Sequence, residues 1–108
     1  MKKYKVYLSP LAERKLLILL DYLAEEWGDT SRDKFLKKFK SSVDAISSYP
    51  YSCIQSSIIQ NLFKCVVNKY SSFYYRINEN DVEIITIIDN RQDQIKLLVQ
   101  LKNYFRIK

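Results

Sequence analysis

The chain has 108 residues, 47% of them apolar and 14% aromatic, which is enough large side chain to fill one core and excludes compositional disorder. Its single glycine and two prolines argue against a many-turned β-sandwich, a glycine-rich phosphate-binding loop or a flexible linker, so we expect residues 1–108 to form one domain. The net charge of +6 favours an acidic or polyanionic partner.

The first predicted element is a short strand, because Tyr4, Val6 and Leu8 alternate with their neighbours in a period of two. Ser9-Pro10 then predicts the start of a helix, since serine can cap a helix N-terminus and proline fits the first turn. Apolar residues at helical spacing give this helix one apolar face: Ala12, Leu16, Leu19, Leu20, Leu23 and Trp27. The pattern therefore places Leu20 and Trp27 in the core.

A second helix is predicted after the only glycine, Gly28, which stands where a left-handed C-cap would need it. Residues 29–31 supply new N-cap candidates, and apolar residues then recur at helical spacing as far as Pro50: Phe35, Phe39, Val43, Ile46 and Tyr49. The two helices are expected to form an antiparallel hairpin.

Three strands are predicted after a polar, poorly periodic loop over residues 51–61. Aromatic and β-branched residues, separated by Asn-rich turns, predict an antiparallel meander over residues 62–67, 70–77 and 82–89.

The last of these strands is apolar on both faces. Strict alternation puts one set of residues on one face, Val82, Ile84 and Ile88, and another set on the opposite face, Ile85 and Ile87. We therefore expect an interior strand that is covered twice, by the helical hairpin and by a short helix over residues 94–105. The predicted fold class is α+β, in the order β-α-α-β-β-β-α, with the hairpin packed on a small, mostly antiparallel sheet.

Few residues in the chain can carry catalytic or metal chemistry. There is no histidine, and the only cysteines are Cys53 and Cys65, so neither a zinc site nor a Cys-His nucleophile can be assembled. We expect two buried free thiols, with a disulfide as the alternative, and no metal, cofactor or small-molecule substrate. No apolar stretch has the length of a membrane span and no signal peptide is evident, so we expect a cytoplasmic protein.

Several short segments stand in an order and at spacings shared with a known protein family. They are a strand leading into Ser-Pro, two helix ends, an aromatic strand pair and a segment with a late arginine, at residues 4–12, 23–28, 49–50, 63–77 and 88–93. Together they resemble the RelE/ParE superfamily of bacterial toxins, and the long helical hairpin is more similar to ParE-like than to RelE-like members. The resemblance covers essentially the whole chain and implies the toxin of a type II toxin-antitoxin, or plasmid stabilisation, system.

The resemblance implies one of two activities, both silenced by a cognate antitoxin that wraps the toxin. ParE-like members poison DNA gyrase, whereas RelE-like members cleave messenger RNA on the ribosome without a metal. The chain departs from the nuclease pattern where basic or tyrosine residues are expected, at Val66, at Ser71 or Ser72, and at Leu97, and it has no histidine to act as general acid.

The favoured hypothesis is therefore a gyrase-poisoning toxin that is not an enzyme. A ribosome-dependent mRNA endoribonuclease is the first alternative, because Lys64 and Arg91 match basic positions of the family. A non-toxic binding module with the same fold is the second.

Three basic residues are candidate contacts with the target. Arg91 stands at the position of the family's characteristic late arginine, although it can also pair with Asp89 or Asp93. Lys64 and Arg76 alternate with apolar neighbours on their strands and can instead simply face solvent.

The helical hairpin offers a candidate surface for the antitoxin. Antitoxin binding in the resembled family buries apolar toxin surface. Leu20 and Trp27 therefore have a second interpretation, in which they line a groove for the antitoxin instead of belonging to the core.

Overall fold

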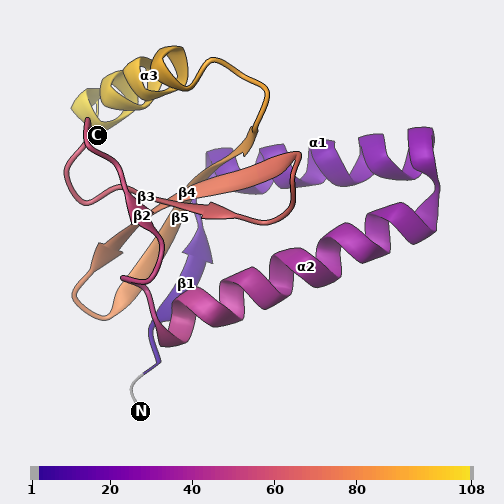
Figure 1. Cartoon of the computed structure of the whole chain (residues 1–108), viewed down its shortest axis with the longest axis horizontal. Helices are drawn as coiled ribbons and strands as arrows, with labels where there is room; N and C mark the ends of the chain where they lie inside the picture. Colours follow the sequence, from indigo (N-terminus) through magenta and orange to yellow (C-terminus); the bar gives the residue numbers. More distant parts are fainter. Residues whose placement is uncertain (1–2, 108) are drawn as a thin grey trace.

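The computed structural model describes residues 3–107 and has the α+β fold that the sequence predicts (Figure 1). Its elements are, in chain order, β1 (Lys5–Leu8), α1 (Pro10–Trp27), α2 (Asp29–Ser48), β2 (Ile54–Gln55), β3 (Phe63–Val66), β4 (Ser71–Asn78), β5 (Asp81–Asp89) and α3 (Gln94–Ile107). The two-residue strand β2 lies within the stretch predicted to be a loop, and α3 continues past residue 105. Among the described residues, no helix is both long and apolar enough to span a membrane.

Ser9 determines where α1 begins. Its Oγ accepts a hydrogen bond from the backbone N–H of Ala12 at 3.0 Å, which caps the helix, and donates one to the carbonyl oxygen of Ile85 at 2.6 Å. At the other end of α1, Gly28 separates the two helices with a φ of 92°, a conformation that glycine adopts without the steric cost of a Cβ. The predicted helical hairpin is therefore confirmed, as is the Ser9 cap. Gly28 ends α1 with a positive φ, but its ψ of 167° lies outside the predicted left-handed helical conformation. The predicted N-caps at residues 29–31 are wrong, because α2 begins at Asp29 and Gly28 at its N-cap offers no side-chain hydrogen bond.

The five strands lie in the order β1-β5-β4-β3-β2. The strand β1 pairs with β5 in parallel, and all other neighbours are antiparallel. The α1–α2 hairpin makes the parallel pair possible, because it carries the chain away from the sheet and back before the meander begins. Two hydrogen bonds fasten the end of this hairpin to the chain before β1: Ser47 Oγ donates to the Tyr4 carbonyl at 2.7 Å, and the Tyr4 N–H donates to the Ser47 carbonyl at 2.8 Å.

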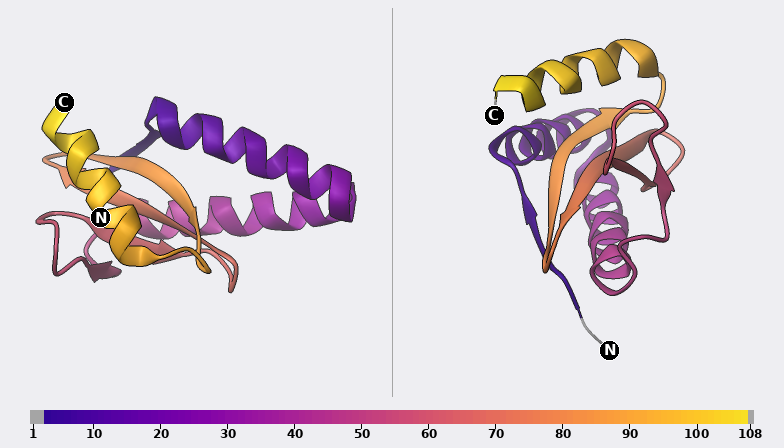
Figure 2. Two further views of the ribbon diagram at one scale, coloured as in Figure 1. Left: turned by 90° about the horizontal axis from the view of Figure 1, so that it is seen from above. Right: turned by 90° about the vertical axis from the view of Figure 1, so that its left-hand side faces the viewer.

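The sheet is covered on both faces, as predicted (Figure 2). The α1–α2 hairpin lies on one face, where its core residues Ala12, Phe35, Phe39 and Ile46 meet Phe63, Cys65, Phe73, Tyr75, Ile77, Val82, Ile84 and Ile87 of the sheet. The helix α3 lies on the other face, where Leu97, Leu98 and Leu101 meet Leu62, Tyr74, Ile85 and Ile88. The strand β5 is interior, and residues 82–88 are all buried.

The alternation predicted for β5 is wrong in its second half. Tyr74 pairs with Thr86 but Tyr75 pairs with Ile84, so Ile85 is an additional residue in β5 and forms a β-bulge. One additional residue reverses the side-chain alternation beyond it, because the period of a strand is two. Ile87 consequently joins Val82 and Ile84 in the core beneath the hairpin, whereas Ile88 joins Ile85 beneath α3.

Trp27 lies outside the core, contrary to the first interpretation of its spacing. Its side chain is 70% exposed, whereas Leu20 is partly buried and packs against the core as predicted. The helical hairpin extends beyond the end of the sheet (Figure 1), so the apolar spacing of α1 continues past the strands that could cover it.

Candidate functional site

Arg91 follows β5 and is held by the carboxylate of Asp89. Its Nη2 and Nε lie 2.8 and 3.1 Å from the two carboxylate oxygens, and its backbone N–H donates to Oδ1 at 2.9 Å. The side-chain hydrogen bond from Arg91 is the main reason why the pKa of Asp89 is lowered below 3.8. Asp93, the other partner that the sequence allowed, instead accepts hydrogen bonds from the N–H groups of Ile95 and Lys96 at the start of α3.

A polar network fixes the segment that carries Arg91. Asn90 Nδ2 donates to the carbonyl oxygens of Asn68 and Lys69, each at 3.1 Å, and its Oδ1 accepts from Ser72 Oγ at 2.5 Å. The Asn90 N–H also donates to the Tyr70 carbonyl at 2.8 Å. These hydrogen bonds join the end of β5 to the β3–β4 turn, so the backbone that carries Arg91 is held in a defined position.

Two tyrosines, Tyr22 of α1 and Tyr70 before β4, lie close enough to Arg91 to act on its charge. The pKa of Arg91 is raised, mainly by Asp89 and to a smaller extent by the nearby phenols of Tyr22 and Tyr70. Both phenols are about half exposed, and the Lys69 ammonium lies 5.1 Å from the centre of the Tyr70 ring. We call Tyr22, Lys69, Tyr70 and Arg91 the Arg91 patch; it can present two cations and two aromatic rings to a partner.

Arg76 lies on the sheet face that α3 covers and is paired within the protein. Its Nε lies 2.8 Å from Oε1 of Glu83, whose side chain is only 6% exposed. The pairing follows from strand register, because Arg76 of β4 stands directly opposite Glu83 of β5. From the sequence, Arg76 was expected either to contact the target or to face solvent. The salt bridge with Glu83 was not predicted.

Lys64 stands opposite Tyr74 in the β3–β4 pair and lines a hollow of about 230 Å³ between the β2 segment and α3. The other lining residues are Ile54, Gln55, Ser56, Ser57, Tyr74 and Leu98. Burial raises the pKa of the Tyr74 hydroxyl above its ordinary value of 10.

The three basic candidates do not converge on one point. Asp89, which holds Arg91, is opposite Ser71 in β4, while Arg76 is opposite Glu83. Arg76 follows Ser71 by five positions, which correspond to about 17 Å along the strand. Lys64 lies between these two ends, on the neighbouring strand.

The positions at which the chain departs from the nuclease pattern differ in their exposure. Val66 is 61% exposed, whereas Ser71 and Ser72 are buried, and Leu97 is buried on the side of α3 that faces the sheet. The Ser72 hydroxyl donates a hydrogen bond to Asn90 and is part of the network that holds this residue.

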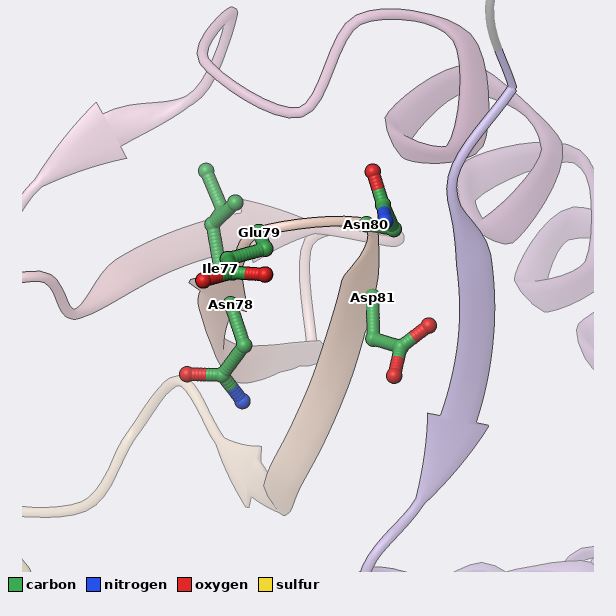
Figure 3. Close-up of a pocket in the computed structure, with 5 residues that line it drawn as sticks. All are labelled: Ile77, Asn78, Glu79, Asn80 and Asp81. Carbon is green, nitrogen blue, oxygen red and sulfur yellow. The ribbon is translucent and has the colours of Figure 1, made fainter.

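Another hollow surrounds the β4–β5 turn and has a volume of about 550 Å³. Figure 3 shows its lining side chains, Ile77, Asn78, Glu79, Asn80 and Asp81, pointing in different directions instead of converging on an enclosed space. It lies at the opposite end of β5 from Arg91. Within residues 3–107, no group of three or more cysteine, aspartate or glutamate side chains is placed to hold a metal ion.

The outer side of α1 exposes apolar residues that the sequence interpretation did not select. Leu17 is 57% exposed, Ile18 62% and Tyr22 51%, in addition to Trp27 at the hairpin tip. We call Leu17, Ile18 and Tyr22 the α1 face. Trp27 instead lies on the side of the helix that carries Leu20 and Leu23, beyond the strands that cover them. A signal was present in the sequence, because the unbroken apolar run over residues 16–20 goes more than once around a helix and cannot be buried on one side.

Comparison with known proteins identifies the family of this fold. The sequence matches the family described as "ParE toxin of type II toxin-antitoxin system, parDE" over residues 6–94, so the match ends at the first residue of α3. A search of curated proteins finds no match.

Solved structures share the fold at low sequence identity. A chain of the chromosomal ParDE toxin-antitoxin system from P. aeruginosa is 12% identical, with 81% of this chain and 96% of that chain covered and a TM-score of 0.69. The YoeB dimer from Staphylococcus aureus is 14% identical, with 78% and 93% covered and a TM-score of 0.54. Protein HP0894 from Helicobacter pylori is 8% identical, with 82% and 97% covered and a TM-score of 0.54. The structures support the fold, and the family match over well over half of the sequence shows that the chain belongs to the ParE toxin family of type II toxin-antitoxin systems.

Proposed function

We propose that this toxin acts in the cytoplasm by poisoning DNA gyrase, with the Arg91 patch as its contact with the target. The supporting observation is the separation of the basic side chains. Cleavage of RNA would need groups that activate a hydroxyl, stabilise charge and protonate a leaving group around one phosphodiester. Arg91 and Arg76 instead lie at opposite ends of β4, and Arg76 is paired with the buried Glu83.

Arg91 is suited to exchange its partner for a group on the target. Its side chain is 77% exposed, and the fork-shaped contact with Asp89 already has the geometry that a carboxylate or phosphate of a partner would use. An exposed ion pair contributes little to stability, so replacing Asp89 by an external anion has a small cost. The Asn90 network meanwhile keeps the backbone of the patch in place.

The proposal is tested by DNA supercoiling with purified gyrase and relaxed plasmid. The toxin is expected to stop supercoiling and to accumulate cleaved DNA. Arg91→Gln should lower this potency about tenfold or more, because hydrogen bonds to a charged partner are lost. Lys38→Gln is the matched control, since it removes an exposed charge from α2, away from the patch.

Two outcomes would contradict the proposal. One is unchanged gyrase activity in the presence of toxin that circular dichroism shows to be folded. The other is equal potency of Arg91→Gln and Lys38→Gln, which would remove the patch from the mechanism. New messenger RNA ends after induction, without a supercoiling defect, would favour ribosome-dependent cleavage instead.

The antitoxin that the family implies is proposed to cover the α1 face. Leu17, Ile18 and Tyr22 expose more than half of their surface, and an extended or helical antitoxin segment could bury them. Tyr22 belongs both to this face and to the Arg91 patch. One antitoxin segment could therefore cover the apolar residues and block Arg91 at the same time.

A further inference from the structure

The two cysteines are brought opposite each other by the short strand β2. Ile54 pairs with Lys64 and Gln55 pairs with Phe63 in an antiparallel ladder. Continuing this register by one residue places Cys53 opposite Cys65. The strand that the sequence did not predict is therefore the element that joins the two thiols.

The hydrogen-bond pattern defines the kind of pair that they form. The Ser56 N–H donates to the Leu62 carbonyl at 2.7 Å, and this places residues 56 and 62 at a hydrogen-bonded position of the ladder. Such positions alternate, so Cys53 and Cys65 occupy a non-hydrogen-bonded position, where opposing Cα atoms are about 4.5 Å apart. Disulfides form at Cα separations of about 4.4–6.8 Å.

The side chains also point toward each other. Both cysteines are free thiols, as predicted; Cys65 is buried and Cys53 is partly buried. The pKa of Cys65 is raised to about 12, first by burial and then by the adjacent Cys53 thiol, which lies within hydrogen-bonding reach. Around them, the Tyr75 hydroxyl donates to the Pro50 carbonyl at 2.7 Å and holds the preceding turn against the sheet.

We propose that Cys53 and Cys65 are a reversible dithiol site that closes to a disulfide when it meets a low-molecular-weight disulfide. The more accessible Cys53 attacks first as a thiolate, forms a mixed disulfide and releases one small thiol. Cys65 then attacks the Cys53 sulfur, forms the internal disulfide and releases the second small thiol. The protein loses two electrons and two protons, and the small disulfide takes up both to become two thiols.

Closure would fasten β2 to β3 covalently. The bridge would span residues 53–65, including the segment that borders the hollow beside Lys64. A cross-link of this kind restricts the unfolded chain, so the oxidised protein should melt at a higher temperature, by on the order of 5 °C or more. The inference does not depend on gyrase as the target.

The test uses the reduced full-length chain and oxidised glutathione as the small disulfide. Mass spectrometry should show the loss of two hydrogens, and peptide mapping should join Cys53 to Cys65. The melting temperature should rise and return to its first value after reduction. Cys53→Ser should show neither change.

A register-shifted variant is the matched control. Ser52→Cys in the Cys53→Ser background keeps two thiols but moves one of them to the opposite side of the strand, where it should not reach Cys65. A lasting glutathione adduct on Cys53 of the parent protein, a dimer linked through Cys53, or two thiols that stay free would each overturn the proposal. Equal internal closure in the shifted variant would overturn its geometric basis.

Discussion

Asp89 and Arg91 show how a local sequence relationship becomes a candidate site. Their separation of two residues allows the pairing that the sequence suggested, and the structure contains it. No comparable pattern pointed to Asn90, because the carbonyl groups that it binds belong to a turn about twenty residues earlier. The approach of Tyr22 from α1 likewise depends on the packing of a distant helix.

At the residue scale, we predict that Arg91→Gln raises the pKa of Asp89 toward 3.8. The folded-state pKa of Asp89 lies below that ordinary value, so the pair stabilises the protein above pH 3.8 and this contribution is lost as the pH falls through the lowered pKa. Titration of the Asp89 carboxyl group by nuclear magnetic resonance measures the shift. Lys96→Gln, which changes another exposed cation, should leave the titration unchanged; an unchanged Asp89 pKa in Arg91→Gln would refute the assigned cause.

At the scale of elements, local signals predict helices better than they predict strands here. Ser9, Pro10 and Gly28 mark α1 and its end by their own chemistry. Ile54 and Gln55 form a strand only because Lys64 and Phe63 are available to pair with them. Ile85 in turn becomes a bulge through the register of β4 against β5, which alternation within one strand does not contain.

Ser9 provides the test at this scale. Ser9→Ala would leave the Ala12 N–H without its acceptor and the Ile85 carbonyl without the hydroxyl that donates to it. The substitution should therefore lower the free energy of unfolding by about 1–3 kcal/mol. Urea denaturation measures this loss. Ser41→Ala, at an exposed position of α2, should change the value by less than about 0.5 kcal/mol. Equal stability of the two variants would show that the cap does not contribute as proposed.

For the whole molecule, the family match includes the helices on one side of the sheet but not the helix on the other side. The ParE toxin match includes the helical hairpin and the sheet but stops where α3 begins. The second core nevertheless depends on α3, because Leu97, Leu98 and Leu101 cover Tyr74, Ile85 and Ile88. The helix α3 therefore covers one face of the sheet from outside the range that matches the family.

The prediction at this scale concerns recognition by the antitoxin. Ile18→Glu should weaken binding of the cognate antitoxin about tenfold or more, because it places a charge in the α1 face, and growth arrest should persist when the antitoxin is co-expressed. Ile95→Glu is the control, since Ile95 is 69% exposed on α3, across the sheet. Isothermal titration calorimetry measures both affinities. Equal affinities would exclude the α1 face as the binding surface.

Trp27 is the only tryptophan of the chain and is exposed at the tip of the helical hairpin, so its fluorescence reports on the surroundings of that tip. Its indole is already largely in contact with water in the folded protein, so its fluorescence should be emitted at long wavelength and change little when the core unfolds. A partner that covers the hairpin tip would instead transfer the indole to an apolar environment and shift its emission to shorter wavelength. The chain thus contains an intrinsic optical probe that separates association at the hairpin from loss of the fold.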